Sequence, residues 1–329
     1  MKKVLSVIIP VYNGETYIDK FIKGITEQSI FNQLFIIFVD DGSSDHTYKK
    51  LKEYQCMYSE NIRVFTKENN GVSSARNVGM EMIETPFYSF ADIDDVMHER
   101  LFERLYQMIQ ETDADMVCAA IQKVAVEQES HIDTKNICGD TPEIKNLDSE
   151  SAIRMLLRAP EQNAVYSKIY RTNTLGTIRF DERLSISEDK LFVFQCMMHS
   201  KKIGVSGEIL YFYIQQPLSA MNYTNARKKL GQDIVIDIID KEIKKNYPNS
   251  YPLCAAVRAE IHAGSFIKVY TNDKIYKDKC KYYRQSVCNC PLTFIFSQLK
   301  GLSRNKVLLV RFFPYFFSII RIKKYKNLI

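Results

Sequence analysis

The sequence predicts an α/β protein with a mixed, mostly parallel sheet flanked by helices and a helical region at the C-terminal end. Short apolar runs alternate four times with segments of helical periodicity over roughly the first ninety residues. This alternation is typical of right-handed βαβ units, which build a parallel sheet with helices on both faces. Beyond residue 226 the apolar pattern is helical alone.

Each element follows from its own pattern of apolar residues. Nearly continuous apolar runs predict four buried strands, at residues 4–9, 34–39, 62–65 and 87–90. Helical spacing predicts the helices between them, at 17–25, after Asp45 and at 72–83. The elements expected next are a helix over 97–111, a strand over 114–120, a loop over 127–147, a strand over 163–171 and a helix opened by the segment 185–192. Pro248 separates two helices of the C-terminal region.

Length and composition indicate two domains. The chain has 329 residues, of which 46% are apolar, and this is enough for a sizeable core. We expect an α/β domain over 1–222, with halves at 1–120 and 121–222, and a helical region over 223–329. The apolar run at the N-terminus is too short for a signal peptide, which predicts a cytoplasmic protein. Eight scattered cysteines then predict reduced, mostly buried thiols.

Basic residues concentrate at the C-terminal end. Residues 281–329 include ten Lys or Arg and no Asp or Glu, whereas the remainder has 35 basic and 39 acidic residues, a net charge of −4. The apolar, aromatic stretch 307–320 is shorter than the ~20 residues of a membrane span, and Lys323, Lys324 and Lys326 follow it. This pattern predicts peripheral contact with the cytoplasmic face of the inner membrane. The alternative is a pair of helices that pack on the α/β domain. The charge of the remainder gives no reason to expect nucleic acid as a partner.

Polar side chains follow the first three strands. They are Tyr12, Asn13, Asp40, Asp41 and Asn70, and Pro10 stands at the first of these strand ends. Because the carboxyl ends of parallel strands meet at one edge of a sheet, we expect these residues to line one ligand site. A carboxylate there can accept the imide N–H of a uracil base, and Arg76 in the next helix suits a phosphate oxygen. Taken singly, each motif is also an ordinary turn or a solvated helix.

An acidic cluster follows the fourth strand. Asp92, Asp94 and Asp95 fall within four residues. Carboxylates this close repel one another unless a cation lies among them, and hard oxygen ligands favour Mg²⁺ or Mn²⁺. Such a cation would in turn hold a phosphate. The alternative is a solvated turn that caps the next helix, since Asp is a favoured residue there.

A second acidic pair, Glu188 and Asp189, opens a later helix. Acidic residues in a first helical turn are favoured by the helix dipole alone, so this pair has a structural explanation as well. The first strand is followed neither by Gly-x-Gly-x-x-Gly nor by a P-loop motif. A bound nucleotide would therefore be held by carboxylates and a metal instead of a glycine-rich loop.

Together these motifs resemble the family-2 inverting glycosyltransferases, which have the GT-A fold. The resemblance covers Ser6 to about Ser219, two thirds of the chain. The matching motifs are Pro10-Val11-Tyr12-Asn13, Val39-Asp40-Asp41-Gly42-Ser43-Ser44-Asp45, Asn70-Gly71-Val72-Ser73-Ser74-Ala75-Arg76-Asn77, Asp92-x-Asp94-Asp95 and Glu188-Asp189. The family accepts many sugars, so these motifs are specific for mechanism and not for substrate.

The resemblance implies a role for each motif. Asp41, with Asp40 beside it, would hold the nucleoside base, and Asp92 would approach the ribose and the donor sugar. Asp94 and Asp95 would bind Mn²⁺ or Mg²⁺ on the diphosphate. Asp189 would be the catalytic base, with Glu188 close to one of the sugars. Pro10, Tyr12, Asn13, Asn70 and Arg76 would complete the donor site. Gln215-Gln216 stands where the family often has an Arg or His.

The implied activity is transfer of a hexose-type sugar from a nucleotide donor, with uridine diphosphate expected, to a hydroxyl of a saccharide or lipid-linked acceptor. The expected setting is synthesis of a bacterial exopolysaccharide, capsule, O-antigen or teichoic acid. One alternative is a sugar nucleotidyltransferase, although the first strand is not followed by the basic, Gly-rich loop of that class. Another alternative is a nucleotide-sugar-binding module without catalysis.

Overall fold

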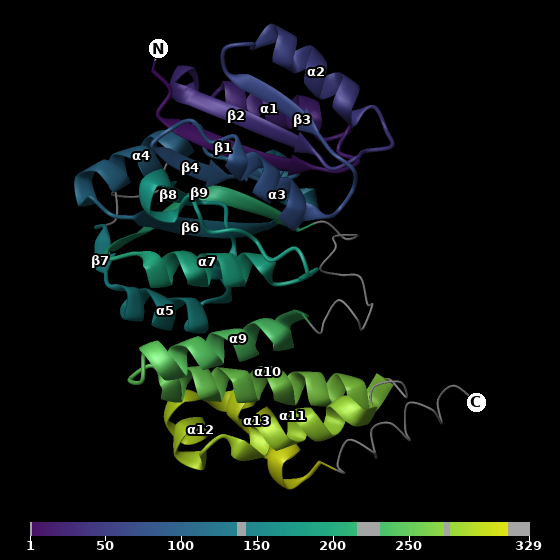
Figure 1. The fold of residues 1–329 in the computed structure, drawn as a ribbon, viewed down its shortest axis with the longest axis vertical. Coiled ribbons are helices and arrows are strands. Elements are labelled where there is room, and N and C mark those ends of the chain that lie inside the picture. Colours follow the sequence, from purple (N-terminus) through teal and green to yellow (C-terminus); the bar gives the residue numbers. More distant parts are fainter. Residues whose placement is uncertain (1, 137–142, 216–230, 273–276, 315–329) are drawn as a thin grey trace. The chain divides into compact units, whose positions relative to one another are not determined.

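One mixed sheet forms the centre of the N-terminal part of the chain (Figure 1). The structure is a computed structural model that describes residues 2–136, 143–215, 231–272 and 277–314. The chain divides into two units, Met1–Thr224 and Asn225–Ile329. The strands are β1 (Leu5–Val11), β2 (Leu34–Asp40), β3 (Ile62–Thr66), β4 (Phe87–Phe90), β5 (Val96–Met97), β6 (Met116–Ala125), β7 (Lys145–Leu147), β8 (Lys168–Arg171) and β9 (Ile203–Gln215). Their order is β3-β2-β1-β4-β8-β6-β9-β5, and β7 pairs with β9.

The first four strands are parallel, as the alternation of strands and helices predicts. β1 lies between β2 and β4, with Leu5 opposite Leu34 on one side and Phe87 on the other. β3 continues the parallel half beside β2, whereas β8 is antiparallel to both β4 and β6. Every residue of β1 and β2 is buried. Burial on both faces explains why these two strands are apolar at nearly every position.

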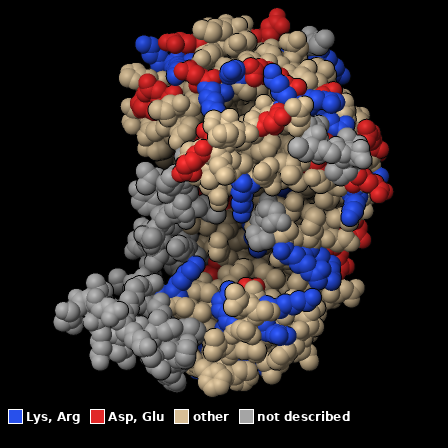
Figure 2. Space-filling view, turned by 180° about the vertical axis from the view of Figure 1, so that it is seen from behind, with Lys and Arg blue, Asp and Glu red and all other residues tan. Residues whose placement is uncertain are grey.

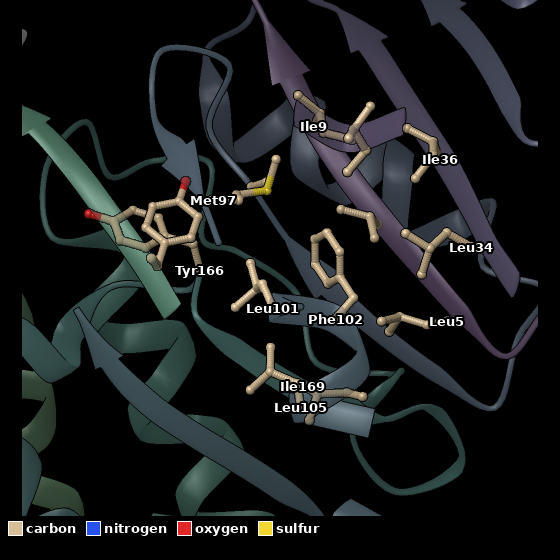
Figure 3. Close-up of a cluster of buried hydrophobic side chains, with 14 of the residues drawn as sticks. Leu5, Ile9, Leu34, Ile36, Met97, Leu101, Phe102, Leu105, Tyr166 and Ile169 are labelled. Atoms are coloured by element: carbon tan, nitrogen blue, oxygen red, sulfur yellow. The ribbon is translucent and has the colours of Figure 1, made fainter. Parts of the chain in front are cut away.

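Helices cover both faces of the sheet. They are α1 (Ile18–Thr26), α2 (Thr47–Met57), α3 (Val72–Glu81), α4 (Leu101–Thr112), α5 (Ser149–Arg158), α6 (Thr172–Leu175) and α7 (Glu188–His199), with 3-10 turns η1 (Phe31–Gln33), η2 (Val126–His131) and η3 (Pro160–Asn163). On one face, α1 and α4 pack on alternate residues of β1 and β2 in a core that contains Leu5, Leu34 and Phe102 (Figure 3). On the other face, α3 lies directly against β1: a Cβ atom on Gly79 would be 2.5 Å from Ile8 Cγ2.

Two elements begin later than their sequence patterns predict. The helix expected over 97–111 begins at Leu101, because the two residues of β5 pair with β9 before the helix starts. The strand expected over 163–171 begins at Lys168. Ser167, just before it, has a φ of 55°, which is a left-handed conformation that interrupts an extended chain.

The segment 127–147 is not the continuous loop that its polar composition predicts. It contains most of η2 and the short strand β7, and residues 137–142 lie outside the described part. The strand expected over 114–120 extends to Ala125, because β6 pairs with the long strand β9 beyond an irregularity near Ala120. Pairing with a distant strand is not visible in local periodicity.

The C-terminal unit is helical, as the sequence pattern predicts. Its helices are α9 (Gly231–Asn246), α10 (Tyr251–Asn272), α11 (Lys277–Asn289), α12 (Leu292–Gln298) and α13 (Gly301–Phe312). The break at Pro248 separates α9 from α10. Small residues such as Ala256 and Ala259 on α10 pack with Val287 of α11 and Val307 of α13. None of the helices in the described ranges is long and apolar enough to cross a membrane.

The cysteines of the described residues are free thiols. Cys118, Cys196, Cys254 and Cys290 are buried, and Cys56 is exposed. Cys138 lies outside the described residues. The scattered positions of the buried thiols match their behaviour as small apolar side chains.

The contact between α3 and β1 predicts a large difference between two glycine substitutions. Gly79→Ala would place a methyl group 2.5 Å from Ile8 Cγ2 and 3.4 Å from Val39 Cγ2, whereas a Cβ on Gly24 of α1 meets nothing within 4 Å. We expect Gly79→Ala to lower the free energy of unfolding by about 1–3 kcal/mol. Gly24→Ala should leave it unchanged or raise it by up to about 1 kcal/mol. Urea unfolding of both variants measures the difference, and equal stabilities would contradict the close approach.

Candidate active site

The loops after β1 and β2 are fastened to each other at the carboxyl edge of the sheet. Asn13, with a φ of 48°, accepts a hydrogen bond at Oδ1 from the backbone N–H of Ser44 at 2.8 Å. The Asn13 N–H donates to Ser43 Oγ at 2.9 Å, and the Gly14 N–H donates to Thr47 Oγ1 at 2.9 Å. The motifs after the first two strands therefore form one structure, as their positions at strand ends predict.

Asp40 and Asp41 connect β2 to the segment after β3. Both side chains are buried. Asp41 Oδ1 accepts from Lys67 Nζ at 2.6 Å and from the Asn70 N–H at 3.1 Å, and Asp41 Oδ2 accepts from the Gly71 N–H at 2.7 Å. Asp40 Oδ2 accepts from the hydroxyl of Thr66 at 2.9 Å. These carboxylates organise the edge of the sheet, and Asp41 Oδ2 keeps capacity for a second donor.

The remaining residues expected in the donor site lie at the same edge. Pro10 is the sixth residue of β1 and is buried opposite Val39 of β2. Tyr12 follows this strand and is 54% exposed, so its ring is accessible to a ligand. Asn70 is exposed and contributes its backbone N–H to Asp41.

A buried arginine joins three of the expected acidic residues. The Arg76 guanidinium projects from α3, and its Nη1 lies 2.5 Å from Asp189 Oδ1 and 3.5 Å from Glu188 Oε1. Its Nη2 lies 3.1 Å from Asp92 Oδ1. The Phe180 ring lies 5.4 Å from the guanidinium carbon. Residues more than one hundred positions apart in the chain therefore meet in one cluster, in which Arg76 contacts carboxylates.

Hydrogen bonds of Asn77 hold the segment before α7 in place. Asn77, next to Arg76, accepts from the Phe180 N–H at 2.8 Å and donates to the Phe180 carbonyl at 3.0 Å. Asn77 also donates to Glu182 at 2.9 Å. These bonds tie the segment before α7 to α3. The first turn of α7, with Glu188 and Asp189, is thereby kept beside Arg76.

Burial and mutual proximity shift the pKa values of the ionisable groups in this cluster. Burial raises the pKa of Asp189 to about 8, with Arg76 opposing the rise and Glu188 and Asp92 adding to it. Burial alone would lower the pKa of Arg76, but Asp189, Asp92 and Glu188 raise it above its ordinary value. The Asp189 side chain is still 24% exposed, so a ligand can reach it.

The acidic cluster after β4 contains two carboxyls with raised pKa values. Burial, followed by Asp92, raises the pKa of Asp94 to about 6. Burial and the charges of Asp92 and Asp94 raise the pKa of Asp95 well above its ordinary value. Asp95 Oδ1 accepts from the Ile214 N–H at 2.9 Å, while its buried Oδ2 has no hydrogen-bond partner. An unpartnered buried carboxylate oxygen suits a cation ligand.

An aromatic stack borders this cluster. The Tyr166 ring stacks on Tyr211 at 4.3 Å and on Tyr213 at 6.2 Å between centroids. The Tyr211 hydroxyl accepts from the Asp92 N–H at 3.1 Å. Tyr211 and Tyr213 belong to β9 and face Tyr166 because alternate strand residues share a face. Gln215 ends the same strand, and Gln216 and Ser219 lie outside the described residues.

Some residues of the site carry no motif in the sequence. They are Lys67 and Tyr166, which reach the site only through the fold. No group of three or more His, Cys, Asp or Glu with metal-binding geometry occurs within the described ranges. Three acidic residues, Asp92, Glu188 and Asp189, surround Arg76, and Asp94 and Asp95 lie next to each other after β4.

Comparison with known proteins identifies the family. The model of the glycosyl transferase family 2 matches residues 6–170, half of the chain. This chain belongs to that family. The match begins within β1, ends within β8 and includes Asp41, Arg76 and the acidic cluster after β4. The family assignment agrees with the resemblance carried by the motifs.

Curated relatives of this family 2 member are named for teichoic acid biosynthesis or as poly(ribitol-phosphate) glycosyltransferases. The minor teichoic acid biosynthesis protein GgaB of Bacillus subtilis is 32% identical over 259 residues, which are 75% of this chain and 27% of GgaB. Its counterpart GgaA is 29% identical, and the matched region is 49% of GgaA. The chain therefore spans half or less of these two relatives. The poly(ribitol-phosphate) beta-N-acetylglucosaminyltransferase TarP of Staphylococcus aureus is 24% identical, with 94% of this chain and 98% of TarP covered.

Solved structures confirm the GT-A fold expected from the sequence. The crystal structure of S. aureus TarS 1-349 superposes with a TM-score of 0.66 and 22% identity, covering 94% of this chain and 87% of TarS 1-349. The same protein in complex with UDP-GlcNAc gives a TM-score of 0.65 and 20% identity. At this identity the comparison concerns the fold.

Proposed function

We propose that this family 2 member is an inverting glycosyltransferase that moves a sugar from a uridine diphosphate donor to a hydroxyl of a cell-envelope polymer. The observation that carries the proposal is the meeting of Arg76, Asp92, Glu188 and Asp189 at the carboxyl edge of the sheet. A partly exposed carboxylate beside a guanidinium offers a base and a phosphate contact within one site. The halves expected at 1–120 and 121–222 would serve the nucleotide and the acceptor.

The names of the relatives support a donor and an acceptor class. TarS has been crystallised with UDP-GlcNAc, and TarP is named for transfer to poly(ribitol-phosphate). GgaA and GgaB are named for teichoic acid biosynthesis. We therefore propose a nucleotide-diphospho-sugar donor and a hydroxyl-bearing acceptor of the teichoic-acid type, either free or lipid-linked.

The chemistry requires one proton transfer and one departing group. The acceptor hydroxyl attacks the anomeric carbon and gives its proton to the Asp189 carboxylate, a step worth about 10²–10⁴-fold. As the new C–O bond forms, the bond from the anomeric carbon to the diphosphate breaks, and UDP leaves with the electron pair. Glu188 would orient a sugar hydroxyl. Arg76 would meet the diphosphate, while Asp92 would contact the ribose and the donor sugar.

The nucleoside is assigned to the edge formed by the loops after β1, β2 and β3. Asp41 Oδ2 would accept the imide N–H of uracil, supported by Asp40 and the backbone of Asn70. Tyr12 would provide an exposed aromatic surface for the base. Pro10 and Asn13 would shape the same pocket through the loop that Asn13 fastens.

The carboxylates after β4 fit a divalent cation. Asp95 has a buried oxygen without a partner, and burial together with the neighbouring carboxylates raises the pKa values of Asp94 and Asp95, which a cation would lower. We propose that Asp94, with Asp95, holds Mn²⁺ or Mg²⁺ together with oxygens of the donor. When bound, such a cation neutralises charge on the leaving diphosphate.

The base assignment is tested with Asp189→Asn. The amide cannot accept the acceptor proton, so we expect transfer to fall by about 10²–10⁴-fold while donor binding persists. Calorimetry with UDP-GlcNAc measures binding, and release of UDP in the presence of a teichoic-acid acceptor measures transfer. Asp113→Asn is the matched control, because Asp113 is 91% exposed and pairs only with Arg171 at the surface. Near-normal turnover of Asp189→Asn would contradict the assignment.

The cation proposal is tested with Asp94→Ala. We expect wild-type affinity for a UDP-sugar to fall when a chelator removes divalent cations and to recover with Mn²⁺. The variant should bind weakly in both conditions, because it lacks the proposed ligand. Equal wild-type affinity with and without chelator would exclude a role for the cation in donor binding.

We also propose that the C-terminal unit contacts the cytoplasmic face of the membrane through α12 and α13. Leu302 is 87% exposed and Phe312 is 55% exposed, although Val307 and Val310 of the same helix are buried. Residues 281–314 include six Lys or Arg and no acidic residue. The face of this unit seen in Figure 2 is mainly uncharged with basic side chains. Exposed apolar residues beside basic residues suit an anionic lipid surface. Lys323, Lys324 and Lys326 lie outside the described residues.

The membrane proposal is tested by flotation with liposomes. We expect the full chain to float with anionic vesicles and to stay in solution with neutral ones. The double variant Leu302→Gln, Phe312→Gln should lose most of this binding. Met57→Gln is the control, since Met57 is a 70% exposed apolar residue of the other unit. Failure of the full chain to float with anionic vesicles would remove the proposal.

A further inference from the structure

Lys168, the first residue of β8, is a buried charged residue without a role in the scheme above. Its side chain has no solvent exposure, and its Nζ has no hydrogen-bond partner. Lysine is almost never fully buried unless it is paired, because an isolated buried ammonium is costly. Burial lowers the pKa of Lys168, while Cys118 and Asp189 oppose that change. A buried cation without a bonded partner calls for an explanation.

The strand geometry directs Lys168 toward the first turn of α7. Lys168 and Tyr170 are two residues apart on β8 and therefore share a face of the sheet. The Tyr170 ring contacts Phe192 of α7 at 5.8 Å between centroids. Asp189 precedes Phe192 by three residues, so both lie on the same side of the helix. Lys168 thus lies beneath the helical turn that carries the proposed base.

The charges around Asp189 come from several elements. The titratable groups that face it or Lys168 are Arg76 of α3, Asp92 after β4, Cys118 of β6, Tyr166 before β8, Tyr170 of β8 and Glu188 of α7. Asp92 and Glu188 both disfavour a negative charge on Asp189. Arg76 and Lys168 are the cations of this set, and only Arg76 is hydrogen-bonded to Asp189.

Arg76 and Lys168 differ in whether they can stay beside Asp189 during turnover. In the proposed function Arg76 would meet the donor diphosphate, which would compete with Asp189 for the same guanidinium. Lys168 is enclosed and cannot leave. Without a second cation, Asp189 would then stand beside two carboxylates at the moment it must accept a proton.

We propose that Lys168 is a positioning residue that keeps Asp189 ionised beside Glu188 and Asp92 while Arg76 is engaged with the donor. This inference rests on the proposed function of Asp189 as the base. Lys168 acts through the field of a fixed buried charge and touches no substrate. At the effective dielectric constant of protein sites, a buried charge moves the pKa of a neighbouring carboxyl by roughly one.

The test compares pH profiles of kcat/KM for Lys168→Met and the wild type. Asp189 must be deprotonated to act, so the rate falls as pH drops through its pKa. Removing the cation should move the acid limb of the profile to a pH about one unit higher. At pH values on that limb, kcat/KM should be about tenfold lower than in the wild type. The high-pH plateau and the affinity for UDP should stay unchanged. Lys168→Arg, which keeps the charge, should retain the wild-type limb.

A matched control and a second readout separate the possible outcomes. Lys123→Met removes an exposed charge from neighbouring β6 and should leave the profile unchanged. The carboxyl ¹³C resonance of Asp189, assigned with Asp189→Asn, reports its titration without any activity. If Lys168→Met does not fold, Lys168→Gln takes its place in both measurements. An unchanged Asp189 titration in the folded variant overturns the inference. Normal transfer by Asp189→Asn overturns the proposed function instead.

Discussion

The contact on which the site depends is the buried guanidinium of Arg76 among three carboxylates. Its side chain is 4% exposed, so water cannot replace a missing partner. Removing a charge from water is costly, and the cost is offset only when its hydrogen-bonding groups find partners. Asp92, Glu188 and Asp189 supply partners for Nη1 and Nη2 from the loop after β4 and from α7, while the buried Nε has none. The position of α7 relative to α3 is therefore tied to this one group.

The same contact explains why polar residues occur in segments that otherwise build a core. α3 lies against β1 closely enough to require Gly79, and this approach brings Arg76 over the edge of the sheet. Asn77, one residue further, fastens the segment before α7 through both polar groups of Phe180. Close packing and the polar cluster thus depend on the same helix. A displacement of α3 would disturb both.

The sequence predicts the parallel half of the fold well because burial on both faces produces an apolar run that is visible in the local sequence. β1 and β2 are apolar at consecutive positions, and the end of β2 follows from Asp40, whereas β1 continues past Pro10 to Val11. The site was predictable only as a set of strand ends. The partners of Asp41, the stack of Tyr166 on Tyr211 and the burial of Lys168 arise from strand pairing between distant segments. The conformation of Ser167 likewise has no periodic pattern to indicate it.

Charge balance in the site bears on how an anionic donor could bind. Asp92, Asp94, Asp95, Glu188 and Asp189 are five carboxyls, whereas the cations named near them are Arg76 and Lys168. Burial is the main cause of the raised pKa values of Asp94 and Asp95, and the neighbouring carboxylates add to it. A diphosphate adds further negative charge, and like charges in a partly buried site repel strongly. In the proposed scheme a divalent cation would relieve the repulsion on both sides at once. The donor would then bind together with the cation rather than before it.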